Sequence, residues 1–313
     1  MAVFKNLFKY DELYQDFSKQ GYEILRNEPL SKYTTFKIGG PADLFIQVNR
    51  ISQLQKIIKL IKEINIPFFI LGNGSNLLVS DDGFRGIVIK LSGDFNKTSL
   101  LPGNKVLCGC GAALNSACAF AMKNSLSGLE FAWGIPGSCG GAVYMNAGAY
   151  NSDISEVIDS CTFMTPAGEI EEITQGNMQF AYRKSFFTDR NYIALSITLN
   201  LVPGNQDNIR SKMRENMSKR KLKQPLDFPN CGSVFKRPGN GYYAGALIEG
   251  SGLKGKSFGG AMVSHKHAGF IINTGSAKCS DVVNLINYIK KTVYEDSGVL
   301  LECEVKALGD INL

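Results

Sequence analysis

The sequence has few of the residues that metal sites and disulfide frameworks require. Its 313 residues include two histidines, His265 and His267, and eight cysteines without a C-x-x-C pair. A structural zinc site usually takes its Cys and His ligands from two closely spaced couples at ligand spacing, and among the cysteines only Cys108 and Cys110 form a close couple. We therefore predict no metal site, and we expect reduced, mostly buried thiols as in a cytoplasmic protein.

Long apolar runs and dense positive charge are also missing. No run approaches the roughly 20 apolar residues of a membrane-spanning helix, and residues 1–17 lack an apolar signal segment. The formal net charge is +6, and the lysines are dispersed except between Arg210 and Lys223. Nucleic-acid-binding proteins usually show a denser basic stripe. We expect a cytoplasmic protein that binds neither membranes nor nucleic acids and whose charge suits a small polyanionic ligand.

Charged side chains are absent from residues 133–150, WGIPGSCGGAVYMNAGAY, which contain five glycines. A neutral backbone of this kind could lie flat against a large planar ligand and point its N–H groups at carbonyl or phosphate oxygens. The alternative is a tight packing turn between a strand and a helix. On this segment alone, both interpretations stay open.

A second uncharged loop, GNGSN at residues 72–76, lies between two short apolar segments. Hydrophobic periodicity predicts a helix over 52–65, and buried strands over 68–71 and 77–79. Backbone N–H groups of such a loop can bind a diphosphate, although an ordinary turn is the alternative. Two buried strands that converge on one Gly, Asn and Ser loop favour the binding function.

Two segments imitate nucleotide-binding motifs. Residues 250–257, GSGLKGKS, match the phosphate-loop pattern, which requires a buried strand before it and a helix after it. Residues 241–249 instead read as a helix, and 258–263 read as extended. Residues 109–111, GCG, lack the third glycine and the strand of a dinucleotide-binding fingerprint. We reject both motifs.

The C-terminal third begins with a basic helix over 208–224. A long amphipathic helix follows, for which we predict Ser280 as the N-cap and Gly298 as the terminating residue. The alternation of residues 299–308 predicts a final strand with Glu304 on its polar face.

Several segments together resemble the UDP-N-acetylenolpyruvoylglucosamine reductase family and occur in the family's order from about residue 20 to the end. The matching segments are FKIGGPADLF (36–45), ILGNGSNLLVSDDGFRGIVI (70–89), GLEFAWGIPGSCGGAVYMNAGAY (128–150), YRKSFF (182–187), CGSVFKRP (231–238), GLKGKSFGGAMVSHKHAGFIIN (252–273) and ECEVKALG (302–309). The last five of these segments are specific to this family in combination.

The resemblance implies an α+β fold of three lobes. Two lobes would form an FAD-binding domain of the vanillyl-alcohol-oxidase (PCMH) type, and a C-terminal α+β domain would bind the substrate. The implied division is an N-terminal segment (1–30), FAD lobes at 31–91 and 92–203, and a substrate domain at 204–313 whose final strand returns to the active site.

The implied activity is NADPH-dependent reduction, through non-covalent FAD, of the enolpyruvyl group of UDP-N-acetylenolpyruvoylglucosamine to UDP-N-acetylmuramate in peptidoglycan precursor synthesis. Arg183 would be the active-site cation, Ser233 the proton donor and Glu304 the catalytic carboxyl group. The residues that would bind the substrate are Lys223, Lys254 and His267. The residues that would bind FAD are Gly72, Asn73, Gly74, Ser75, Asn76, Gly134, Ile135, Pro136, Gly137, Ser138 and Gly141.

Two features depart from the family's common pattern. The segment between Arg183 and Ser233 is short, so the chain resembles the subclass without an inserted substrate-covering loop. Lys306 stands where an arginine is common. An FAD-linked oxidase or dehydrogenase of another substrate, or a non-catalytic nucleotide-binding module, are the alternatives. The sequence predicts no oligomeric state.

Overall fold

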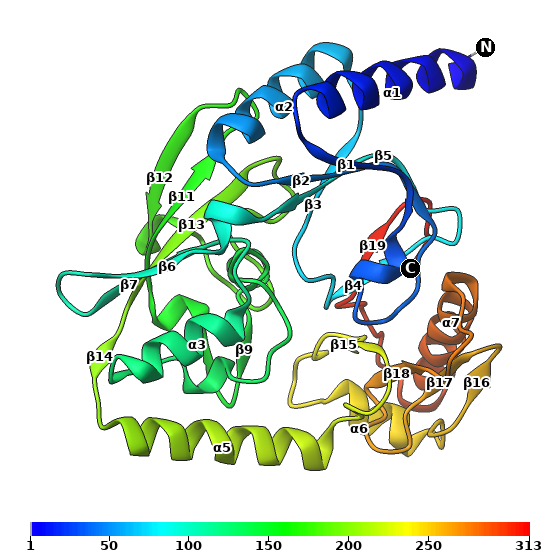
Figure 1. Cartoon of the computed structure of the whole chain (residues 1–313). Coiled ribbons are helices and arrows are strands. Elements are labelled where there is room, and N and C mark those ends of the chain that lie inside the picture. Colours follow the sequence, from blue (N-terminus) through cyan, green and yellow to red (C-terminus); the bar gives the residue numbers. More distant parts are fainter. Residues whose placement is uncertain (1) are drawn as a thin grey trace. The chain divides into compact units, whose positions relative to one another are not determined.

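The computed structural model describes residues 2–313, with side chains from Tyr10 on (Figure 1). The helices are α1 (Ala2–Lys19), α2 (Ile51–Ile64), α3 (Leu114–Lys123), α4 (Cys139–Tyr144), α5 (Gln206–Lys223), α6 (Ala244–Gly250) and α7 (Cys279–Ser297), with 3-10 turns η1 (Leu30–Tyr33), η2 (Gly93–Asn96), η3 (Glu130–Ala132), η4 (Ile154–Glu156) and η5 (Gln175–Asn177). The strands are β1 (Glu23–Pro29), β2 (Pro41–Val48), β3 (Phe68–Leu71), β4 (Leu77–Val79), β5 (Phe84–Leu91), β6 (Thr98–Leu101), β7 (Lys105–Gly109), β8 (Leu126–Ser127), β9 (Gly148–Ala149), β10 (Ser152–Asp153), β11 (Ile158–Met164), β12 (Ile170–Thr174), β13 (Ile193–Asn200), β14 (Val202–Pro203), β15 (Asn230–Ser233), β16 (Ser257–Phe258), β17 (Ala261–Val263), β18 (Phe270–Asn273) and β19 (Lys306–Leu308).

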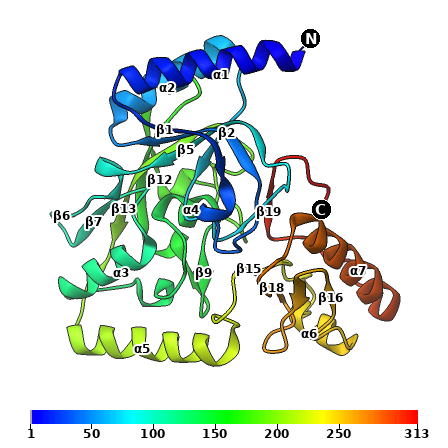
Figure 2. The same cartoon turned by 45° about the vertical axis from the view of Figure 1, so that its right-hand side comes forward.

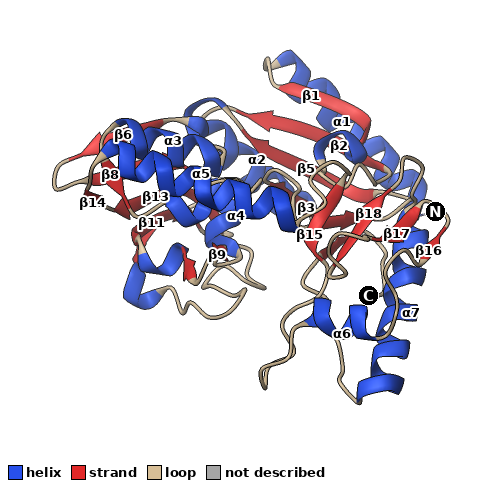
Figure 3. Cartoon of the chain, turned by 90° about the horizontal axis from the view of Figure 1, so that it is seen from below, coloured by secondary structure: helices blue, strands red, loops and turns tan. Residues whose placement is uncertain are grey.

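The chain divides into two compact units. Unit 1 consists of residues 1–25, 44–73 and 86–219, and unit 2 consists of residues 26–43, 74–85 and 220–313. The chain passes from one unit to the other within β1, β2, β5 and α5, and between Asn73 and Gly74. Helices and strands occur in both units (Figure 3), which confirms the predicted α+β class.

Unit 1 is built around a five-stranded antiparallel sheet with the order β12-β11-β13-β7-β6. The predicted helix near 52–65 is α2, which buries Leu54, Ile57, Ile58 and Ile61 at helical spacing. Burial of each such side chain contributes roughly 1.5–3 kcal/mol. In a smaller sheet, β3 pairs in parallel with β5 and places Leu71 opposite Lys90.

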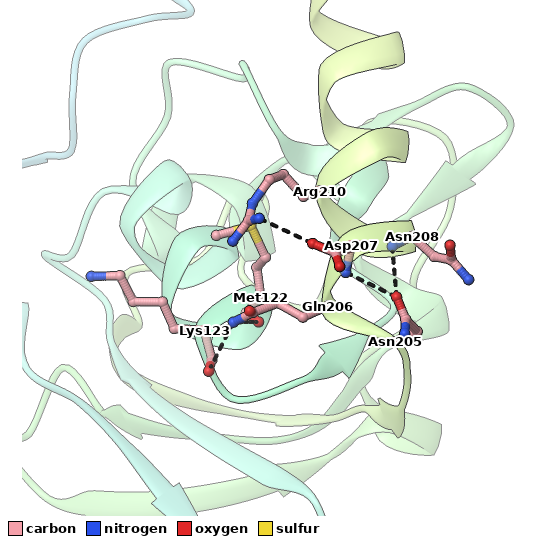
Figure 4. A network of polar contacts seen from close by, with 7 residues as sticks. All are labelled: Met122, Lys123, Asn205, Gln206, Asp207, Asn208 and Arg210. Atoms are coloured by element: carbon pink, nitrogen blue, oxygen red, sulfur yellow. Dashed lines mark hydrogen bonds and ion pairs between the residues drawn. The ribbon is translucent and has the colours of Figure 1, made fainter.

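The start of α5 is fixed within unit 1 by side-chain contacts (Figure 4). The Asn205 side-chain oxygen accepts hydrogen bonds of 3.0 Å from the backbone N–H groups of Asp207 and Asn208, which caps the helix. The Gln206 amide donates to the Met122 carbonyl at the end of α3. These contacts hold α5 beside α3, as Figures 1 and 2 both show.

Unit 2 has an antiparallel sheet with the order β15-β18-β17-β16, packed with α7, and a separate parallel pair of β4 and β19. Helix α6 precedes the phosphate-loop look-alike at 250–257, and the short strand β16 follows it. This order is the reverse of what a phosphate loop needs. Strand β7, before the 109–111 look-alike, lies in an antiparallel sheet. The structure therefore agrees with the rejection of both motifs.

Three details of the sequence-based predictions were wrong. Helix α7 starts at Cys279, and Asp281, rather than Ser280, accepts a hydrogen bond from the Lys278 N–H at the cap. Residues 299–305 form no strand, because an isolated bridge between Cys303 and Phe235 takes the place of a continuous ladder, and the extended part is the short β19. In β3 only Leu71 is buried. The predicted terminator, Gly298, is confirmed as a left-handed C-cap with φ 69°.

All eight cysteines are free thiols, and seven of them are buried as expected, while Cys303 is partly exposed. Burial raises the pKa of Cys118 and of Cys231 to about 12, so both stay protonated at neutral pH. In residues 2–313, no helix is long and apolar enough to cross a membrane, and no cluster of His, Cys, Asp and Glu side chains could hold a metal ion.

Candidate active site

The first half of the 72–76 loop lies against the glycine-rich segment within unit 1. A Cβ atom on Gly72 would lie 2.6 Å from the Ser138 Oγ, so glycine permits this close approach. The Asn73 side chain donates a 3.2 Å hydrogen bond to the Pro136 carbonyl. Two of the uncharged segments singled out from the sequence therefore meet at residues 72–73 and 136–138.

The second half of the loop belongs to unit 2. Gly74 is buried with φ +58°, and a Cβ on it would lie 2.3 Å from the Tyr33 carbonyl oxygen. The Asn76 side chain donates a 3.1 Å hydrogen bond to the Glu304 carbonyl. The loop thus continues directly into contacts with the predicted catalytic residue of the same unit.

The glycine-rich segment forms a turn that leads into α4. The Gly134 N–H donates a 2.7 Å hydrogen bond to the Asn115 side chain, and the Gly137 carbonyl accepts a 3.0 Å bond from the Leu114 N–H. The Ser138 Oγ caps α4 by accepting from the Gly141 N–H at 3.1 Å. The local structure is therefore a packing turn, and contact of this turn with a ligand stays a prediction.

Several backbone donors of these two loops have no acceptor. Among the described residues of unit 1, the N–H groups of Gly72, Asn73, Gly137 and Ser138 form no hydrogen bond. Ser138 is buried, and an unpaired buried donor costs roughly 1–3 kcal/mol. A ligand with several phosphate oxygens would satisfy such donors, so the residues present fit the diphosphate of FAD.

Ser233 and Glu304 are brought together within unit 2. Ser233 ends β15, and the carbonyl of the next residue, Val234, accepts a 2.7 Å hydrogen bond from the Glu304 N–H. Phe235 and Cys303 form an antiparallel bridge beside this bond. Glu304 is 9% exposed and Ser233 is half-buried. The two predicted catalytic residues are thus adjacent on neighbouring backbone segments.

Arg183 belongs to unit 1. It lies in the tight turn between Ala181 and Lys184 with φ +56°, a conformation that few arginines adopt. Its guanidinium donates a long, 3.5 Å hydrogen bond to the Asn146 carbonyl and lies 5.3 Å from the centre of the Tyr182 ring. The strained backbone at a predicted catalytic cation is typical of functional sites.

Lys223 and Lys254, two of the predicted substrate-binding residues, lie close enough in unit 2 to influence the pKa of the third, His267. Burial is the main reason why the pKa of His267 is lowered, and the positive charges of Lys254 and Lys223 add to it, while a backbone hydrogen bond and Glu249 oppose the shift. The Gly269 N–H donates a 3.0 Å hydrogen bond to His267 Nδ1. The imidazole is therefore neutral at pH 7 with its proton on Nε2, where it can donate to a ligand oxygen.

Two residues near the loops were not identified from the sequence. Asn115 fixes the Gly134 N–H, and Lys90 donates a 2.9 Å hydrogen bond to the Gly72 carbonyl. The signal for Lys90 was present in the sequence, because it is a lysine between apolar residues of a buried strand, FRGIVIKL. No local pattern distinguishes Asn115 from an ordinary exposed helix residue.

Two family models match parts of the chain. Residues 42–174 match the model described as "FAD binding domain", which covers both uncharged loops. Residues 224–308 match "UDP-N-acetylenolpyruvoylglucosamine reductase, C-terminal domain", which covers Ser233 and Glu304. The fold and the two loops therefore define a flavoprotein with an FAD-binding part and a separate C-terminal domain.

Relatives of nearly full length identify the family within that class. The chain is 47% identical over 290 residues to UDP-N-acetylenolpyruvoylglucosamine reductase of Clostridium novyi, covering 92% of this chain and 93% of the relative. The identity to the Listeria monocytogenes reductase is also 47%, with 92% and 95% coverage. The crystal structure of the reductase from Thermus caldophilus has a TM-score of 0.79 and 32% identity, covering 92% and 99%. The chain belongs to the UDP-N-acetylenolpyruvoylglucosamine reductase family, whose members are FAD-containing oxidoreductases.

Proposed function

We propose that the chain reduces the enolpyruvyl group of UDP-N-acetylenolpyruvoylglucosamine to give UDP-N-acetylmuramate, with NADPH as the reductant. The observation that carries this proposal is the 47% identity to reductases of that name over 92% of the chain. The two matching family models cover both uncharged loops (42–174) and the segment that holds Ser233 and Glu304 (224–308). When bound, FAD would supply the two-electron reduction.

The side chains have the properties that the remaining chemistry needs. Reduction of an enol ether leaves negative charge at the carbon beside the carboxylate, and a guanidinium such as Arg183 stabilises that charge through paired hydrogen bonds. The hydroxyl of Ser233 would deliver a proton to this carbon, and the adjacent Glu304 would bind the same region of the substrate. Lys223, Lys254 and the Nε2–H of His267 would bind the nucleotide phosphates.

The loops would bind FAD non-covalently. Residues 72–76 would hold its diphosphate with their N–H groups, and residues 134–138 together with Gly141 would line the rest of the cofactor. The division into segments at 1–30, 31–91, 92–203 and 204–313 stays a prediction. The eight free thiols are typical of a reducing compartment, and we propose the cytoplasm.

An anaerobic spectroscopic experiment distinguishes this function from the two alternatives. We expect NADPH to bleach the flavin band of the purified protein, and addition of UDP-N-acetylenolpyruvoylglucosamine to restore it. A nucleotide-binding module would show no bleaching. An FAD-linked enzyme for another substrate would be bleached without recovery, and either result would contradict the proposal.

A further inference from the structure

Lys90 is a half-buried cation whose environment lacks a counter-ion. It lies on β5 opposite Leu71, the last residue of β3, so its ammonium reaches the start of the 72–76 loop. Its Nζ donates a 2.9 Å hydrogen bond to the Gly72 carbonyl. Among the residues that the structure describes, no carboxylate forms an ion pair with Lys90.

Such a lysine is unfavourable for the protein alone. An ammonium group has three donors, and in residues 2–313 one acceptor is present for them. Burial lowers the pKa of Lys90 because the charged form loses hydration without gaining an anionic partner. An anionic partner stabilises a cation that has lost part of its hydration. An anion bound at this loop would supply the missing partner.

The loop itself lacks the charge that a diphosphate requires. Residues 72–76 and 134–138 carry no charged side chain, so they offer only backbone and side-chain dipoles to two phosphate groups. Lys90 is hydrogen-bonded to the first residue of this loop, next to the N–H groups of Gly72 and Asn73 that have no acceptor.

We propose that Lys90 is the cation of the FAD-diphosphate site. Its ammonium group adds a full positive charge beside the uncharged loop. The same group binds the Gly72 carbonyl oxygen through a hydrogen bond, which offsets the repulsion between this oxygen and the phosphate oxygens. This inference rests on the proposed binding of the FAD diphosphate by residues 72–76.

The test measures flavin binding by full-length protein from which the flavin has been removed, with FAD and riboflavin as separate probes. Riboflavin has no phosphate, so charge at the diphosphate site does not affect it. We expect Lys90→Met to raise the Kd for FAD about 10- to 100-fold, the range for loss of a charge-assisted hydrogen bond. The Kd for riboflavin should not change. Added salt should weaken FAD binding less in Lys90→Met than in the wild type.

Two further variants complete the test. Lys90→Arg keeps the charge and should stay within a few-fold of wild type, whereas the control Lys56→Met removes an exposed lysine of α2 and should have no effect. An unchanged FAD Kd in Lys90→Met, or equal weakening of FAD and riboflavin, would overturn the inference. Gly72→Ala separates failure of the Lys90 inference from failure of the proposed FAD binding by residues 72–76, because its new Cβ would crowd Ser138 in the loop itself. If Gly72→Ala also leaves FAD binding intact, the assignment of the loop itself is wrong.

Discussion

Replacement of Ser233 by alanine is expected to lower turnover by about 10²–10⁴-fold, the usual effect of removing a proton donor. The hydroxyl is required only when the substrate carbon takes its proton. Bleaching of the flavin by NADPH should therefore proceed at the wild-type rate, while recovery of the flavin band on addition of substrate becomes slow. Anaerobic stopped-flow absorbance measures the two halves separately.

Ser257→Ala is the matched control, because Ser257 is an exposed serine of β16 in the same unit. It should leave both halves unchanged. If Ser233→Ala slowed bleaching by NADPH as much as recovery, the serine would affect the whole fold or the flavin, and its role as proton donor would be refuted.

Replacement of Gly74 by alanine is expected to destabilise the protein by about 2–4 kcal/mol and to weaken FAD binding. The residue has φ +58°, which strains any side chain, and its new Cβ would lie 2.3 Å from the Tyr33 carbonyl oxygen and 2.9 Å from the Thr34 Cα. Both of these neighbours are backbone atoms, so relief requires movement of the chain. Denaturant unfolding measures the change in free energy.

Gly103→Ala separates the two causes of this loss. Gly103 also has a positive φ, +77°, but nothing lies within 4 Å of the position of its Cβ. It should therefore show only the conformational cost, about 1 kcal/mol. Equal destabilisation by the two variants would show that the contact with Tyr33 contributes nothing, and that the loop is not tightly packed.

The elements that depend on local pattern could be predicted from the sequence. The spacing of apolar residues predicted helices α2 and α7, and short apolar runs predicted strands β3 and β4, all close to their observed bounds. The phosphate-loop look-alike at 250–257 could be rejected because its flanking segments had the wrong periodicity.

The predictions that depended on tertiary contacts were less successful. Alternation of apolar and polar residues over 299–308 predicted a strand. Residues 299–305 are irregular instead, because their backbone bonds to the segment after β15 at isolated points, such as the Glu304 N–H to the Val234 carbonyl. Alternation is compatible with any half-buried extended chain, so it could not reveal this. Strands β3 and β4 flank one loop but belong to different sheets. Sheet membership depends on pairing with strands distant in the sequence, so the local pattern could not predict it.

In the candidate site too, local features could be predicted from the sequence and tertiary contacts could not. The two uncharged loops stand out in the sequence, and their contact through Gly72 and Ser138 is a consequence of the fold. Ser233, Glu304 and Arg183 were named through resemblance to a family, since each alone is an ordinary surface residue type. Lys90 stands out in the sequence as a lysine between apolar residues, but its bond to Gly72 depends on the register of β3 and β5, which the sequence does not show.

The central claim is that this chain couples NADPH oxidation to reduction of the enolpyruvyl sugar nucleotide. The most direct measurement incubates the purified protein with NADPH and UDP-N-acetylenolpyruvoylglucosamine and analyses the nucleotide sugar by mass spectrometry. We predict a product that is heavier than the substrate by two hydrogen atoms and is formed in a one-to-one ratio with the NADPH consumed. Without the sugar nucleotide, under anaerobic conditions, NADPH consumption should stop at one equivalent per flavin. Unchanged sugar nucleotide from a protein that contains FAD would contradict the account.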